Sequence, residues 1–314
     1  MVVSFCDFIS FLNGFEVDEL RDCIDELEDK VDEVLRMSGA YIDEKIVSGL
    51  RDADPEFYFW FCFLRANFLR GRITIANKAF IRFLEYAEKL NYYYFDGFPE
   101  GRIIPNIGFR YAGKIEKVLD QLRDEYGSGC NFVKFIRQVI DQCDDNYPLI
   151  YLELTSKLVG LRNIGSKIAN AIIGEVSWEL SLLRKYELFD VFERLVNTLW
   201  IRRLIFSSFF NVMIDAHVRN FFKKFKLENV EHSHLIFIAS QVKEPIIEML
   251  FYRYFDWVKE EDRSCLLKDY RDYIGANLIE KMIWLIYFVK SNIRKLNINL
   301  SDLKLFRAAD VILD

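Results

Sequence analysis

Apolar residues recur at steps of three and four along most of the chain, which is the spacing of one face of an α-helix. The clearest case is residues 17–37, "VDELRDCIDELEDKVDEVLRM". Residues 73–90 and 112–126 repeat the pattern. The strict alternation of a half-buried strand is hardly found, and no repeat of solenoid length is evident. We therefore predict a compact, all-α fold.

Local residues mark where several of these helices begin. Asp54 and Pro55 suit the N-cap and first position of a mostly buried helix, and Ser301 suits the N-cap of the last helix. Residues 96–108, "DGFPEGRIIPNIG", hold the densest glycine and proline and predict a loop.

Residues 278–293, "LIEKMIWLIYFVKSNI", are the most apolar run. Glu280 and Lys281 interrupt it and Lys290 ends it, so the clean run is only about a dozen residues. That length predicts a buried core helix rather than a membrane span, and we expect no membrane partner.

Composition narrows the chemistry. The 314 residues are 52% hydrophobic, enough for one large domain or two intimate ones. The six cysteines lie far apart, which predicts reduced thiols in a cytoplasmic protein rather than an iron–sulfur cluster. His232 and His234, in "EHSH", have no ligating partner at a suitable spacing, so we predict a solvated loop and no metal. The first residues lack the features of a secretory signal.

Charge is unevenly placed along the chain, whose net charge is −6. Residues 16–56 are strongly acidic, whereas residues 197–226 carry six bases against the single acid Asp215. Those bases are Arg202, Arg203, Arg219, Lys223, Lys224 and Lys226. Local potential rather than total charge governs nucleic-acid binding, so one face is expected to suit phosphate.

Residues 161–176, "LRNIGSKIANAIIGEV", indicate two helices joined by a tight turn. We expect the first helix to end near Val159 and the second to begin at about Ser166. Asn163 and Gly165 are the two residue types that best tolerate positive φ. In such a hairpin, the N–H groups of the turn and the N-terminus of the next helix face a DNA phosphate.

A second segment, "FFNVMIDAHVRNFFKKF", predicts Asp215 as the N-cap of a helix with basic residues after its first turn. Together, "NIGSKIA" and "MIDAHVR" resemble the catalytic segments of helix-hairpin-helix DNA glycosylases. The matching positions are Gly165, Lys167, Ala169, Ile214, Asp215, His217 and Val218. In addition, "NIGFRYAGKIEKVL" and "FCFLRANFL" resemble segments of the 8-oxoguanine glycosylases, including those of archaeal type.

This resemblance implies two helical domains, residues 70–178 and residues 1–69 with 179–314, with the hairpin at the groove between them. It implies that Lys167 attacks the sugar C1′ and that Asp215 stabilises the developing positive charge, which makes the protein a DNA glycosylase and AP lyase acting on oxidised purine. The chemistry requires no cofactor or metal. Asn67, Phe109 and Arg110 would occupy the gap left by the flipped base.

The expected partner is damaged double-stranded DNA, bound by a monomer associated with the nucleoid. Its phosphates would be contacted by the backbone around Asn163 and Gly165 and by three basic side chains, Arg219, Lys223 and Lys224.

Two departures leave alternatives open. Asn163 stands where the family's hairpin usually has its first glycine, and 48 positions separate Lys167 from Asp215, more than in most members (215 − 167). Asp190 has the more ordinary spacing but lacks the surrounding pattern. Lys167 alone would suit a surface lysine, and Asp215 a simple N-cap. The competing function is a non-catalytic DNA-binding or scaffold protein with the same fold.

Overall fold

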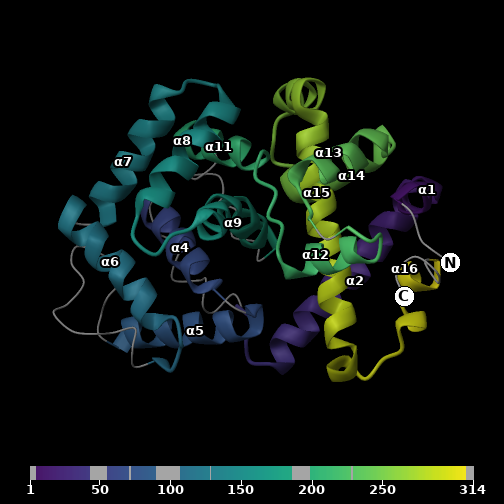
Figure 1. Cartoon of the computed structure of the whole chain (residues 1–314), viewed down its shortest axis with the longest axis horizontal. Helices are drawn as coiled ribbons and strands as arrows, with labels where there is room; N and C mark the ends of the chain where they lie inside the picture. Colours follow the sequence, from purple (N-terminus) through teal and green to yellow (C-terminus); the bar gives the residue numbers. More distant parts are fainter. Residues whose placement is uncertain are drawn as a thin grey trace. The chain divides into compact units, whose positions relative to one another are not determined.

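The computed structural model describes residues 5–42, 55–70, 72–89, 107–127, 129–185, 199–227 and 229–308. Over these ranges every regular element is a helix and no strand is present. Figure 1 shows these helices, coloured along the sequence from the N-terminus to the C-terminus. The predicted all-α class is confirmed.

The chain divides into two compact units. The terminal unit comprises Met1–Met37 and Val212–Asp314, and the central unit comprises Ser38–Asn211. These bounds differ from the predicted ones because residues 38–69 and 179–211 fall in the central unit. Helix α4 (Pro55–Phe68) packs on central helices, and so does α11 (Leu199–Ser208).

Besides α4 and α11, the described helices of the central unit are α5 (Ile73–Lys89), α6 (Ala112–Tyr126), α7 (Gly129–Gln142), α8 (Tyr147–Gly160) and α9 (Ser166–Lys185). Helix α4 packs against α9 and α7, and α11 packs against α8. The helices expected over 73–90 and 112–126 are therefore confirmed. Aromatic side chains fill the core: Phe63 meets Phe132 with ring centroids 5.1 Å apart, and Phe68 meets Phe80 at 5.3 Å.

The terminal unit is built around α15 (Glu260–Leu296). Four helices pack against it: α2 (Val17–Met37), α12 (Ala216–Lys223), α13 (His232–Gln241) and α14 (Glu244–Phe255). The remaining described elements are α1 (Phe5–Gly14), the short 3-10 helix η3 (Leu300–Asp302) and α16 (Lys304–Ala308). The apolar run of α15 is buried, which confirms the predicted core helix. Among the described residues, no helix meets the length and hydropathy needed to cross a bilayer.

Two local predictions in this unit are wrong. His232 and His234 open α13 rather than lying in a solvated loop, and the His234 ring packs near Phe5 and Phe222. Ser301 lies inside the 3-10 helix η3 rather than capping the last helix. The first N–H of α16, on Lys304, instead donates to Glu26 of α2 at 2.8 Å. The start of α13 has a local cap, in which the Glu231 N–H donates to the His234 ring at 3.1 Å, whereas the cap of α16 comes from a side chain far away in the sequence.

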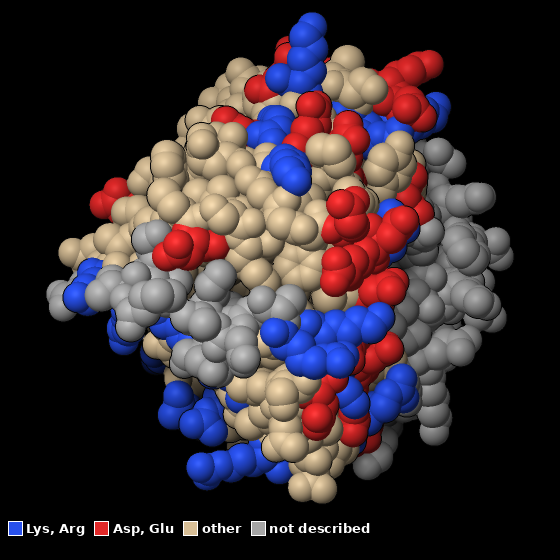
Figure 2. All heavy atoms as spheres, turned by 90° about the vertical axis from the view of Figure 1, so that its right-hand side faces the viewer, with Lys and Arg blue, Asp and Glu red and all other residues tan. Residues whose placement is uncertain are grey.

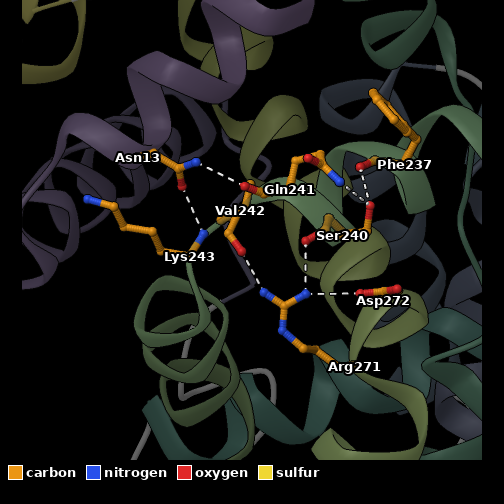
Figure 3. Close-up of polar contacts among 9 residues, drawn as sticks. Asn13, Phe237, Ser240, Gln241, Val242, Lys243, Arg271 and Asp272 are labelled. Carbon is orange, nitrogen blue, oxygen red and sulfur yellow. Dashed lines mark hydrogen bonds and ion pairs between the residues drawn. The ribbon is translucent and has the colours of Figure 1, made fainter.

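The corner between α13 and α14 is held by side chains from two other helices (Figure 3). Asn13 of α1 donates to the carbonyl of Gln241 and accepts from the N–H of Lys243. The Arg271 guanidinium of α15 donates to the carbonyls of Ala239 and Val242. A cation on the last carbonyls of α13 opposes the negative end of this helix.

The acidic helix α2 is partly neutralised within its own unit. Arg253 of α14 binds Asp25 at 2.5 Å and Glu28 at 2.6 Å, and Lys304 binds Asp22 at 3.3 Å. Figure 2 shows acidic and basic side chains next to one another on one side of the molecule, with areas between them that carry neither. At Asp22, Asp25 and Glu28 the negative charge of α2 is therefore opposed by a cation of the same unit.

Candidate functional site

The hairpin turn between α8 and α9 is present in the central unit. Helix α8 ends at Gly160 and α9 begins at Ser166, close to the predicted positions. Asn163 has a φ of +66°, as its type suggested. Gly165 does not use that freedom, because its φ is not positive. Its carbonyl accepts the N–H groups of Ile168 and Ala169, which begins α9.

Arg70 holds this turn to the end of α4. Its Nη1 donates to the Asn163 carbonyl at 2.9 Å. Its Nε donates to the Asn67 carbonyl at 3.0 Å, and its Nη2 to Asn67 Oδ1 at 3.1 Å. Burial lowers the pKa of the guanidinium. Because Arg has a planar fork of donors, the three bonds fix both the direction and the distance of the turn.

Two of the residues expected to contact DNA bases lie in the core. Asn67 is 1% exposed, and its amide donates to the Phe63 carbonyl at 2.9 Å. Phe109 is 6% exposed and stacks on Phe68 with centroids 5.6 Å apart. We therefore remove both from the predicted DNA contacts. Arg110 is exposed, but its guanidinium lies 4.5 Å from the centroid of the Tyr111 ring and donates to the Tyr111 hydroxyl.

Lys167 is the second residue of α9, and its side chain is exposed. The two residues that follow it, Ile168 and Ala169, are buried and fix the orientation of the helix. Lys167 lies at the N-terminus of a helix, as predicted, where the helix dipole disfavours a positive charge. The residues around its exposed side chain do not desolvate the amine.

Asp215 caps α12, as predicted. Its Oδ1 accepts the N–H of His217 at 2.7 Å and that of Val218 at 3.0 Å. Both capping bonds use Oδ1, so capping does not involve Oδ2. The residue is only half-buried. The carboxylate therefore lies at the positive end of a helix with one oxygen oriented by the backbone.

A second carboxyl group near Asp215, that of Glu280, was missed as a functional candidate. Glu280 lies on α15, which packs against α12, and it is 6% exposed. Its pKa is raised to about 8, mainly by burial, with the charge of Asp215 raising it further and Lys281 lowering it. The sequence did contain a sign of it, because Glu280 is the single acid in an otherwise apolar run. It was interpreted only as an interruption of a membrane span.

Aromatic rings lie beside the start of α12. The His217 ring is 6.2 Å from Trp284 and 6.5 Å from Phe288 of α15, measured between centroids. Trp284 and Phe288 stack on each other at 5.0 Å. Asp215, His217, Glu280, Trp284 and Phe288 together form what we call the carboxyl–aromatic cluster.

The basic stretch predicted over residues 197–226 is divided between the two units. Arg203, in the central unit, binds Asp145 at 2.9 Å and Asp141 at 3.7 Å. Arg219 and Lys223, on α12 in the terminal unit, are exposed, and Lys224 lies 5.8 Å from the centroid of the Tyr287 ring. The three basic side chains predicted to contact phosphate, Arg219, Lys223 and Lys224, therefore all lie on α12 or at its end.

The chemistry open to these residues is that of amines and carboxylates. Over the described part of the chain, no three His, Cys, Asp or Glu side chains gather as metal ligands would. The alternative aspartate, Asp190, lies outside the described residues. Comparison of the chain with protein-family models, with curated proteins and with solved structures finds no match.

Proposed function

We propose that the protein is a base-excision DNA glycosylase with AP lyase activity. Its substrate would be oxidised purine in double-stranded DNA, with 8-oxoguanine the leading lesion. The observation that carries the proposal is the α8–α9 hairpin, in which Asn163 takes the left-handed conformation and Lys167 follows at the start of α9. The carboxyl–aromatic cluster around Asp215 supports it.

In the proposed reaction, the unprotonated Lys167 Nζ forms a bond to the sugar C1′ while the bond from C1′ to the base breaks. The bonding pair leaves with the base, which takes up a proton. Loss of a proton from the amine and opening of the sugar ring give a Schiff base. Removal of a C2′ proton then breaks the C3′–O bond and nicks the strand. Asp215 would stabilise the positive charge that develops on the sugar.

The exposure of Lys167 adds one requirement to this mechanism. An amine in water stays protonated at neutral pH, and desolvation is what disfavours its charged form. Since the surroundings of Lys167 leave it exposed, bound DNA has to supply the desolvation. We therefore propose that Lys167 becomes an active nucleophile only in the complex with DNA. The protein would form this complex as a monomer in the cytoplasm.

Borohydride trapping tests the proposal directly. The full chain is incubated with duplexes that each carry one oxidised base, in EDTA, and the Schiff base is reduced to a covalent adduct. The expected result is an adduct and a strand nick with the unmutated protein and neither with Lys167→Gln, although Lys167→Gln still binds the duplex. An adduct with Lys167→Gln would show that another amine is the nucleophile.

The competing function is a non-catalytic DNA-binding protein. The exposure of Lys167 and the burial of Asn67 and Phe109 favour it, because each departs from what a glycosylase site needs. Binding of duplex DNA by the unmutated protein without release of any oxidised base would establish this alternative.

A further inference from the structure

Two cations lie on one tyrosine ring at the start of α6. The Arg110 guanidinium lies 4.5 Å from the centroid of the Tyr111 ring and donates to its hydroxyl. The Lys114 Nζ lies 5.9 Å from the same centroid. The two charges are therefore within about 10 Å of each other, which is the Debye length at about 0.1 M salt, so they repel each other in solution.

Neither cation is neutralised by an acid. Both residues are exposed, and over the ranges that the structure describes neither side chain forms an ion pair. By contrast, Arg203 of the same unit binds Asp145 at 2.9 Å. Arg110 uses one of its five N–H donors on Tyr111, and the Lys114 ammonium donates to no described residue. Both cations therefore have donors left for a ligand.

The charges are also placed against the dipole of the helix. Helix α6 begins at Ala112, directly after Arg110 and Tyr111, and its first turn contains no acidic residue. An acid at this end would stabilise the helix, whereas a cation is repelled by it. This repulsion adds to the repulsion between the two cations, and a bound anion would relieve both.

The same tyrosine lies near the arginine that holds the hairpin turn. Burial lowers the pKa of Arg70, and the nearby Tyr111 hydroxyl opposes this shift. Arg70 in turn donates to the Asn163 carbonyl at 2.9 Å. The two cations on Tyr111 are thus linked through Arg70 to the backbone of the turn.

A second contact joins the same face of α6 to the turn. Lys114 and Gln121 are seven residues apart, which is two helical turns, so they lie on one face about 10 Å apart. Gln121 Oε1 accepts the N–H of Arg162 at 2.5 Å. The face of α6 that begins at Lys114 therefore runs along the central unit to the hairpin turn.

We propose that Arg110 and Lys114 form a phosphate-binding site for the DNA strand whose backbone meets the hairpin turn, so that this strand continues over the start of α6. The guanidinium offers paired donors that match phosphate oxygens. The length of the face, about 10 Å, corresponds to about three nucleotides at roughly 3.4 Å per step of one strand. DNA as the source of the phosphate rests on the proposed function, whereas the affinity for phosphate does not.

The salt dependence of binding tests the site. An undamaged duplex is titrated by fluorescence anisotropy at several salt concentrations with the unmutated protein, Arg110→Gln, Lys114→Gln and the double variant. We expect the slope of log binding constant against log salt to fall by about 0.9 for each cation, with binding about tenfold weaker per cation at about 0.1 M salt. The matched control, Lys134→Gln, removes an exposed lysine of α7 in the same unit and should leave the slope unchanged.

An unchanged slope in the double variant, or an equal fall in the control, would overturn the inference. Thermal unfolding of each variant shows whether the fold is intact, and Arg110→Lys, which keeps the charge, should retain the slope. Calorimetric titration with inorganic phosphate separates the two sources of the anion. Phosphate binding that requires both cations, together with an unchanged slope for DNA, would assign the site to free phosphate and overturn the strand path.

The outcomes separate this inference from the proposed function, because the duplex carries no lesion. A reduced slope in the double variant, with no borohydride adduct on any lesion, would refute the glycosylase and leave the phosphate site. An adduct with the unmutated protein, with no change of slope in the double variant, would refute the site and leave the glycosylase. Absence of duplex binding by the unmutated protein would refute both.

Discussion

Glu280 gives the terminal unit a stability that falls as pH rises. The pKa of Glu280 is about 8 in the folded chain, against 4.5 for an ordinary glutamate. Between these values the folded state holds a proton that the unfolded state has released. The free energy of unfolding therefore decreases with pH over this window, and Glu280 adds no further slope above about pH 8.

The magnitude follows from the width of the window. Each pKa unit corresponds to about 1.4 kcal/mol, so the full shift corresponds to a ceiling of about 5 kcal/mol between pH 4.5 and 8. Glu280→Gln replaces the protonated carboxyl with a neutral group of the same shape, which removes the loss of stability at high pH. We expect the variant to match the unmutated protein at pH 5 and to be more stable by a few kcal/mol at pH 9.

Hydrogen exchange of α15 peptides in increasing urea, at pH values from 5 to 9, reports the stability of the terminal unit, which holds Glu280. When two variants are compared at the same pH, the contributions of the other titrating groups cancel. Glu248→Gln, an exposed glutamate on α14, is the control and should show no pH-dependent difference. A constant difference between Glu280→Gln and the unmutated protein across this range would refute the reasoning, because Glu280 would then keep the same charge in both states.

Three further predictions follow from the site. Asp215→Asn should slow base release on the order of a hundredfold in single-turnover assays. Its thermal stability should stay nearly unchanged, because Asn also caps helices, whereas Asp215→Ala should in addition lower the free energy of unfolding in urea by about 1 kcal/mol. Neutralising Arg219, Lys223 and Lys224 should weaken binding to every duplex and reduce the salt slope by up to about one unit per contact; an unchanged slope would remove α12 from the interface. Arg70→Lys should weaken duplex binding more than the control Arg72→Lys, which changes an exposed arginine nearby, because one ammonium cannot reproduce the three directed bonds of the guanidinium. Equal losses of binding in the two variants would contradict the role of Arg70 in holding the hairpin turn.

The features that the sequence predicted well are those decided by nearby residues. The apolar spacing of residues 17–37 and 112–126 gave helices with those bounds, since periodicity alone determines which face is buried. Asp215 caps α12 through the N–H groups two and three residues later. Asn163 adopts positive φ because its own side chain tolerates it.

The features that it missed depend on distant partners. Arg70 and Asn163 are 93 residues apart, and nothing near either one indicates the bond between them. Asn67 was expected to face DNA, but its amide bonds within α4 and to Arg70 and draws it into the core. The cap of α16 comes from Glu26, which no local pattern around Ser301 or Lys304 can reveal.

The two acids of the carboxyl–aromatic cluster, Asp215 and Glu280, have different surroundings. Asp215 faces two N–H groups at the start of α12, which stabilise a negative charge. Glu280 lies among the buried residues of α15, where burial and the nearby Asp215 raise its pKa. At neutral pH Glu280 therefore keeps its proton, and it is the buried, neutral carboxyl group of the cluster.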